Sequence, residues 1–153
     1  HQYRLIEFVL GNRNQAMMKV HEHRPELHGM LTQELARKSL YHVSLDQLSK
    51  GTGLAINEAA YKLDRPHVAD ASVTEAWLKV YNDPETYWTL YNLAEKLVDI
   101  EDYFRRWRFN HVTTVERIIG FKKGTGGTSG VTYLRKMLEV ELFPELWHLR
   151  GQL

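Results

Sequence analysis

The chain contains no cysteine among its 153 residues. Within this chain, that absence excludes disulfide bonds, thiolate zinc sites, iron–sulfur clusters, thiolate-ligated haem and cysteine nucleophiles. It is also typical of proteins from a reducing compartment, so we expect a cytoplasmic protein. Long hydrophobic runs are missing too, because no stretch approaches the ~20 apolar residues of a membrane-spanning helix.

An excess of charge of one sign is also lacking. The chain carries 20 Lys+Arg against 19 Asp+Glu, a formal net charge of +1. A nucleic-acid-binding domain usually carries a strong basic excess, so we expect no nucleic-acid partner. The lack of a long apolar stretch predicts that the chain has no membrane partner either. Hydrophobic residues make up 43% and aromatic residues 11%, which is enough to build an apolar core. The length predicts a single domain over residues 1–153.

Residues that interrupt helices are few, with 4 prolines and 10 glycines. Apolar residues recur at steps of three and four, and the alternation typical of strands is almost absent, so the sequence predicts an all-α fold. We expect a first helix interrupted near Gly11-Asn12, a second helix through residues 27–40, and a short helix over 74–81. Breaks are predicted at residues 49–53 and at Pro66.

The strongest helical pattern covers residues 84–119. Asp83 is a typical N-cap residue, Pro84 suits the first helical position, and Gly120 suits the C-terminal end. A helix of this length needs packing along all of it, so we expect a helical bundle built around it and an oligomer. A glycine-rich loop follows, and a last amphipathic helix with Val131, Leu134, Leu138 and Leu142 is predicted to end at Pro144.

His111 is the first candidate for chemistry. It lies four residues after Trp107 and four before Val115, so the three side chains share one face of the long helix. A neutral imidazole on a rigid helix can bind a metal ion or a haem iron. The alternative is a core histidine that hydrogen-bonds to a nearby group.

The glycine-rich segment from Gly124 to Gly130 is the second candidate. It follows a helix, and Lys122 and Lys123 precede the glycines, so it matches neither a phosphate loop nor a dinucleotide fingerprint. A loop that closes over a carboxylate ligand suits this composition better than a nucleotide site does. A plain connection between two helices remains the alternative.

Three other clusters have simpler explanations. His21, Glu22, His23 and His28 lack the i, i+4 histidine pair of a helical metal site, and a solvated turn explains them. The run from Arg105 to Arg108 is flanked by acidic residues at helical spacing (Glu101, Asp102 and Glu116), which predicts intrahelical ion pairs on a solvated face. Glu95, Asp99 and Glu101 are explained by an ordinary polar helix face.

Several segments together resemble one known family. Residues 107–120 (WRFNHVTTVERIIG) and 123–130 (KGTGGTSG) are similar to the C-terminal half of tryptophan 2,3-dioxygenases of the bacterial type. Residues 2–8, 10–12, 87–88, 97–99 and 143–146 resemble the same family. The pairing of the W-R-x-x-H motif with the glycine-rich loop at a fixed separation is highly specific, and the resemblance is weakest between Pro25 and Trp77.

The resemblance implies an all-α enzyme that binds haem b. Such an enzyme inserts O₂ across the indole C2–C3 bond of L-tryptophan to give N-formyl-kynurenine, the first step of tryptophan degradation by the kynurenine pathway. It further implies that His111 is the proximal iron ligand, that Trp107 lines the haem, and that Arg4 and Tyr133 lie near its edge. Thr125, with Gly124 and Gly126, would hold the amino-acid end of the substrate. A homotetramer is implied as well.

The resemblance also implies that this chain lacks several residues of the family's active site. The family's substrate-carboxylate arginine, distal histidine and N-terminal tyrosines come from a segment upstream, and Arg4 does not replace that arginine. We therefore expect a preceding segment or a companion chain to complete the site. Two alternatives remain open: a related haem oxygenase acting on another aromatic substrate, and a non-catalytic helical fragment without haem.

Overall fold

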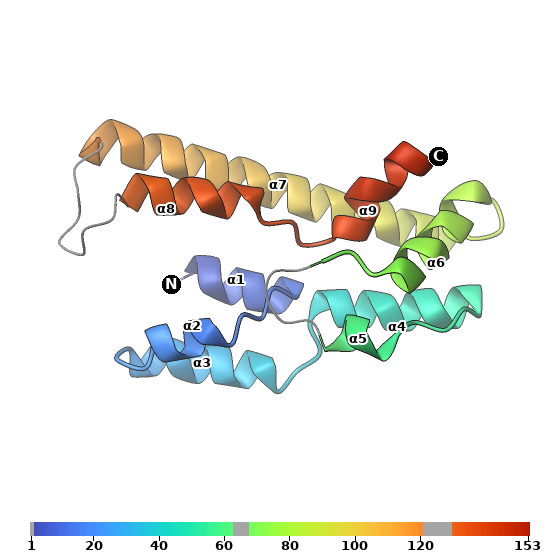
Figure 1. The fold of residues 1–153 in the computed structure, drawn as a ribbon, viewed down its shortest axis with the longest axis horizontal. Coiled ribbons are helices and arrows are strands. Elements are labelled where there is room, and N and C mark those ends of the chain that lie inside the picture. The colour runs from blue at the N-terminus through green and yellow to red at the C-terminus, as the bar shows by residue number, and fades with distance from the viewer. Residues whose placement is uncertain (1, 63–67, 121–129) are drawn as a thin grey trace.

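The computed structural model describes residues 2–62, 68–120 and 130–153. Within these ranges every regular element is a helix and there is no strand, so the predicted all-α class is confirmed (Figure 1). None of the helices in these ranges combines the length and the apolar character needed to cross a membrane. The predicted break at Pro66 lies outside the described residues.

The long helix, α7 (Trp88–Ile119), runs along the upper side of Figure 1. Its 32 residues give a length of about 48 Å. It ends as predicted at Gly120, which has a φ of 65°. The predicted start at Pro84 is wrong. The Asp83 carboxylate instead accepts a hydrogen bond from the backbone N–H of Thr86 (3.2 Å) in a turn, and α7 begins after that turn.

The predicted first and third helical regions are confirmed. The first region forms α1 (Gln2–Leu10) and α2 (Ala16–Val20), with the interruption beginning at Gly11. The third forms α6 (Ala71–Asn82), which extends beyond the predicted residues 74–81 at both ends. Its N-cap, Asp70, accepts hydrogen bonds from the backbone N–H groups of Ser72 (2.8 Å) and Val73 (3.4 Å).

The single helix predicted over residues 27–40 is wrong, because two helices occupy this region: α3 (Pro25–Leu35) and α4 (Leu40–Thr52). Ser39 separates them as an N-cap whose hydroxyl accepts from the backbone N–H of His42 (3.2 Å). The predicted break over 49–53 begins too early, since α4 continues to Thr52 and turns at Gly53 with a φ of 71°. A single helical turn, α5 (Glu58–Tyr61), follows.

The last predicted helix is also shorter than expected. The chain forms α8 (Gly130–Lys136), the 3₁₀ turn η1 (Met137–Glu139), α9 (Pro144–His148) and the 3₁₀ turn η2 (Leu149–Gln152). Pro144 therefore starts a helix, whereas the sequence analysis placed it at a helix end. The reason is that a proline in the first turn loses no helical hydrogen bond.

The helices pack in two layers that meet at the core (Figure 1). Helices α7 and α8 lie side by side in the upper layer, α3 and α4 form the lower one, and α1 lies between them. Helix α6 contacts α4, α7 and α9 and so joins the layers at one end. The main core consists of side chains from α4, α6, α7 and the segment around α9, including Leu45, Leu48, Trp77, Val80, Ala94, Leu97, Leu142, Phe143 and Leu146.

Two charged side chains of α7 fasten the connection between η1 and α9. Glu101 is fully buried and accepts hydrogen bonds from the backbone N–H groups of Leu142 (2.8 Å) and Phe143 (2.9 Å). Arg108, two turns further along the same face, donates to the backbone oxygens of Met137 (2.6 Å) and Val140 (3.1 Å). The predictions that these two residues belong to solvated helix faces are wrong.

A second buried carboxylate links three elements. Glu145 of α9 accepts hydrogen bonds from the hydroxyl of Tyr41 on α4 (2.8 Å) and from the backbone N–H of Asp70 before α6 (3.0 Å). Burial raises the pKa of the Glu145 carboxyl. Burial and the nearby charge of Glu145 raise the pKa of the Tyr41 hydroxyl. These contacts hold α9 against both α4 and α6.

Gly11 is a position where only glycine fits. Its φ is +130°, and a Cβ added there would lie 2.7 Å from the Cβ of Tyr41. Gly11→Ala should therefore lower the free energy of unfolding by about 3 kcal/mol. Gly29→Ala, inside α3 with open space around the added Cβ, should instead raise it by up to about 1 kcal/mol. Urea denaturation of the two variants measures both changes, and equal changes would contradict this assignment.

Candidate functional site

Four residues that the resemblance singles out line the same cavity. Arg4 comes from α1, Trp107 and His111 from α7, and Tyr133 from α8. The cavity has a volume of about 230 Å³, and its other lining residues are Tyr3, His21, Arg108, Val112, Leu134 and Met137. The predicted substrate-binding residues Thr125, Gly124 and Gly126 lie outside the described residues.

A row of parallel rings on α7 leads from the core to the cavity, which Trp107 and His111 line. Phe104 and Trp107 stack with their centroids 5.7 Å apart and their planes inclined by 6°. Trp107 and His111 continue the row at 5.6 Å and 4°. Because positions i, i+3 and i+7 lie on one helical face, the sequence spacing itself produces this arrangement. Tyr3 of α1 stacks against the row, 5.6 Å from the Phe104 ring.

His111 ends this row with an imidazole that is free to bind a ligand. The residue is exposed, and its ring makes no hydrogen bond with the described residues. Trp107 next to it is 41% exposed. Trp107 and His111 share one face of α7 as predicted, but within the described part of the chain that face is exposed to solvent. No core group among the residues that the structure describes bonds to His111, and its role stays a prediction.

Arg4 is held at the rim of the cavity by a buried carboxylate. Its guanidinium donates to Glu7 Oε2 (2.6 Å), and Asn12 donates to Glu7 Oε1 (2.8 Å). Glu7 is only 2% exposed, so the carboxylate is fixed in place. The Arg4 guanidinium carbon lies 5.2 Å from the centroid of Tyr3 and 5.8 Å from that of Tyr133. The result is a cation positioned between two aromatic rings at the cavity.

The phenol of Tyr3 stays protonated over the ordinary pH range. Burial, followed by the negative charge of Glu7, raises the pKa of Tyr3 to about 12. Tyr3 was not among the predicted site residues. Its position in α1, next to Arg4, carries no signal of a site in the sequence, because its contact with α7 depends on how the two helices pack.

His21 is the second lining residue that sequence reasoning missed. It follows α2 directly, and both of its ring nitrogens are buried without a hydrogen-bond partner among the described residues. Burial lowers the pKa of His21, and so do the neighbouring charges of Arg4 and Arg24. The predicted solvated turn describes the exposed Glu22 and His23, but it is wrong for His21.

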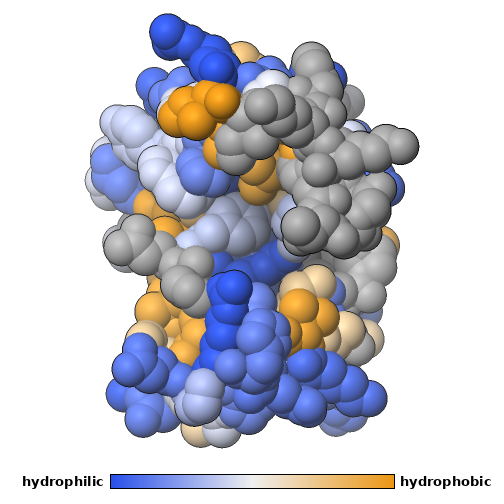
Figure 2. Space-filling view, turned by 90° about the vertical axis from the view of Figure 1, so that its left-hand side faces the viewer, coloured by the Kyte–Doolittle hydropathy of each residue, from blue (hydrophilic) through white to orange (hydrophobic). Residues whose placement is uncertain are grey.

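Figure 2 shows the end of the molecule on the left of Figure 1, where the N-terminal ends of α1 and α8 lie. Hydrophobic side chains lie above and below a more polar band in the middle of this face, and hydrophilic side chains cover its lower edge. A mixed surface of this kind suits a flat ligand that is apolar in its body and charged at its edge.

The donor set of the cavity fits haem. An unpartnered imidazole on a rigid helix is a suitable axial ligand, and the parallel Trp107 ring offers an apolar surface beside it. A guanidinium between two aromatic rings can form charge-assisted hydrogen bonds with a propionate. Among the described residues no group of three His, Cys, Asp or Glu side chains could hold a bare metal ion.

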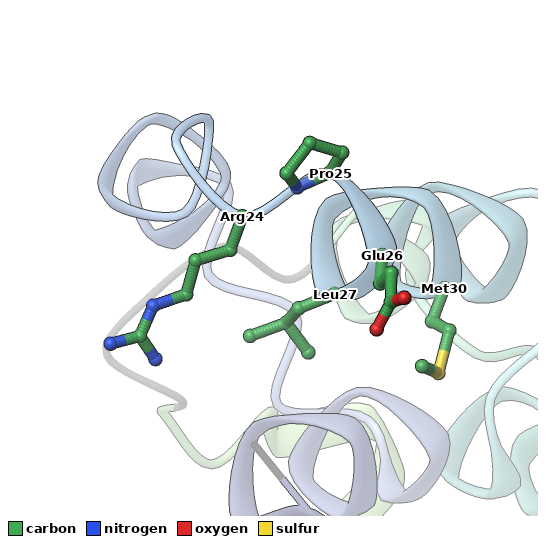
Figure 3. Close-up of a pocket in the computed structure, with 5 residues that line it drawn as sticks. All are labelled: Arg24, Pro25, Glu26, Leu27 and Met30. Atoms are coloured by element: carbon green, nitrogen blue, oxygen red, sulfur yellow. The ribbon is translucent and has the colours of Figure 1, made fainter.

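A larger cavity, of about 810 Å³, lies elsewhere (Figure 3). It is lined by Arg24, Pro25, Glu26, Leu27 and Met30 at the start of α3. It contains none of the predicted site residues and no pair of groups suited to acid–base chemistry. We therefore place the candidate site at the smaller cavity around His111.

Comparisons with known proteins point in the same direction. The family model described as tryptophan 2,3-dioxygenase matches residues 57–153. A tryptophan 2,3-dioxygenase of Ruegeria pomeroyi is 72% identical over 153 residues, which is 100% of this chain and 55% of that protein. Proteins of the same name are 66% identical in a Ruegeria species, over 100% of this chain and 55% of that protein. In Bradyrhizobium diazoefficiens the identity is 60%, over 97% of this chain and 54% of that protein. The chain spans about half the length of the curated relatives it matches.

Proposed function

Because the chain belongs to the tryptophan 2,3-dioxygenase family, we propose that it forms the haem-binding half of an enzyme that oxidises L-tryptophan with O₂ to N-formyl-kynurenine. The observation that carries the proposal is the unpartnered imidazole of His111 at the wall of the cavity, stacked parallel to Trp107. The same reaction would begin tryptophan degradation by the kynurenine pathway.

His111 would hold the haem iron through its imidazole. Haem bound there would supply the activation of O₂. The backbone of α7 around His111 is rigid, because Val112 next to it is buried and Arg108 is anchored to η1. That rigidity fixes the position of the imidazole.

Arg4 and Tyr133 are proposed to hold the edge of the haem. The Arg4 guanidinium keeps donors available after its bond to Glu7, and a carboxylate at the cavity would take one of them. Trp107 would offer apolar contact to the haem beside His111.

The glycine-rich loop is proposed to bind the substrate. In this proposal Thr125, with Gly124 and Gly126, binds the amino and carboxylate groups of tryptophan. Binding there would keep the indole close to O₂ and orient the two reactants.

The exposed side of α7 supports a larger assembly. Ile100, Tyr103, Trp107 and Ile118 lie at helical spacing on this side and are 39%, 67%, 41% and 77% exposed. We infer that the rest of the protein and further copies cover this surface, in a homotetramer. The absence of cysteine supports the cytoplasm as the proposed location.

Native mass spectrometry of the purified protein tests the proposal. We expect the mass of the assembled subunits to include haem, in a ratio of one per chain, and we expect tryptophan to be converted to N-formyl-kynurenine. A protein that carries no haem and takes up none from added haemin would refute the proposal. Haem uptake with turnover of a different indole in place of tryptophan would support a related oxygenase.

A further inference from the structure

His21 lines the proposed haem cavity but has no part in the proposed binding of haem or of tryptophan. It follows α2, and its backbone N–H closes the last turn of that helix at Met17 and Met18. The side chain then points into the cavity that Arg4, His111 and Tyr133 also line. Three elements distant in sequence therefore converge with His21 on one small volume.

His21 is half-buried as a residue, but its two ring nitrogens are both buried. Both ring nitrogens are inaccessible to solvent and neither has a hydrogen-bond partner among the described residues. Buried polar side-chain atoms are nearly always hydrogen-bonded in folded proteins, because an unmade bond is costly. A ligand in the cavity would provide the missing partner.

The charges around His21 indicate the sign of that partner. The charged groups that act most strongly on its ring among the described residues are Arg4, Arg24 and His23, all of them cationic or able to become so. The Glu7 carboxylate beside Arg4 already accepts hydrogen bonds from Arg4 and Asn12. A negatively charged acceptor in this position would be attracted by Arg4 and would accept an N–H of His21 at the same time.

We propose that His21 is a carboxylate-binding residue of the cavity and donates a ring N–H to a carboxylate beside Arg4. The inference rests on the proposed function and extends it to a residue outside the motifs that identify the family. Two carboxylates are available in that function: a propionate of the haem and the carboxylate of tryptophan. They present the same acceptor chemistry to the imidazole.

The first arm of the test measures haem affinity without tryptophan. His21→Phe keeps a flat ring and removes the donor, and His23→Phe is the matched control because His23 is exposed two residues away. Apoprotein is titrated with haemin and, separately, with haemin dimethyl ester, following the Soret band. If the acceptor is a propionate, His21→Phe weakens haemin binding about tenfold. The same variant then leaves the affinity for the ester within twofold of wild type, and His23→Phe changes neither.

The second arm measures tryptophan affinity in the haem-loaded protein by the perturbation of the Soret band. If the acceptor is the substrate carboxylate, His21→Phe leaves haemin affinity unchanged and weakens tryptophan binding about tenfold, while binding of tryptamine, which lacks the carboxylate, is unaffected. Unchanged affinity for both haemin and tryptophan would overturn the inference. An equal loss for haemin and its ester would also overturn it, since the role would then be packing.

A second variant separates the hydrogen bond from folding. His21→Gln retains an N–H donor, so it should recover most of the affinity lost in His21→Phe. Thermal unfolding followed by circular dichroism reports whether each variant is folded. If His21→Phe does not fold, His21→Leu takes its place. A weakening of haemin or tryptophan binding by up to about tenfold in His21→Leu, recovered in His21→Gln, then supports the same conclusion. Absence of recovery overturns it. Failure of the wild type to bind haemin would refute the proposed function itself, whereas equal affinities of wild type and variant refute only the role of His21.

Discussion

His111→Ala is expected to lower the haem affinity of the protein by more than about a hundredfold, because the substitution removes the proposed axial ligand. The other side chains at the cavity with ring nitrogens are Trp107, whose indole N–H is only a donor, and His21, which we propose to bind a carboxylate. Titration with haemin, followed by the Soret band, measures the loss.

Two controls make this result specific to the iron. His148→Ala removes a histidine that is 57% exposed at its side chain and bonded to Glu141, so it should leave haem affinity unchanged. Free imidazole should restore a Soret band of six- or five-coordinate histidine-ligated type in His111→Ala, because the truncated side chain leaves room for it. A variant that retains stoichiometric haem without added imidazole would exclude His111 as the ligand.

The long helix was the element best predicted by the sequence. The recurrence of apolar residues from Leu90 to Ile118 is a local property of the chain, and α7 follows it to Gly120. The predicted start failed because Asp83 and Pro84 fit both an N-cap and a tight turn, and local sequence does not distinguish the two. The same ambiguity affects Pro144, which suits the position after a helix as well as the first turn of one.

The break between α3 and α4 was missed for a related reason. Leu35 and Leu40 are five residues apart, close enough to the helical spacing to be read as one amphipathic run. Ser39 carries the only strong local signal, and its cap became apparent only with its hydrogen bond from the backbone of His42.

Part of the candidate site could likewise be predicted from local sequence, and part of it could not. The motif around His111 places Trp107 beside it through helical geometry alone, and the stacked rings follow from that spacing. Tyr3 reaches the cavity through its stacking on Phe104 and Trp107, and His21 through the position of the turn after α2, and no local pattern specifies either. Arg108 and Glu101 were interpreted as surface charges because most charged helical residues are exposed, and only tertiary structure reveals the backbone groups they satisfy.

Glu101→Ala is expected to destabilise the protein by about 3–5 kcal/mol. The Glu101 carboxylate is fully buried and is the acceptor for two backbone N–H groups, those of Leu142 and Phe143. Its Oε1 also accepts from Arg105 (3.2 Å). Alanine leaves both backbone donors buried without an acceptor and also leaves Arg105 without this partner. Urea denaturation monitored by circular dichroism measures the change in the free energy of unfolding.

The adjacent carboxylate provides the matched control. Asp102 pairs with Arg106, and the two side chains are 45% and 64% exposed, so Asp102→Ala should cost less than about 1 kcal/mol. Glu101→Gln should fall between the two, because the amide keeps one oxygen acceptor but loses the charge. Since Glu101 fastens the segment that follows Met137, a lining residue of the cavity, haem affinity should decrease in Glu101→Ala and remain at the wild-type value in Asp102→Ala. Equal stability of the two alanine variants would show that the hydrogen bonds of Glu101 are dispensable and that the hydrophobic core alone holds α9 in place.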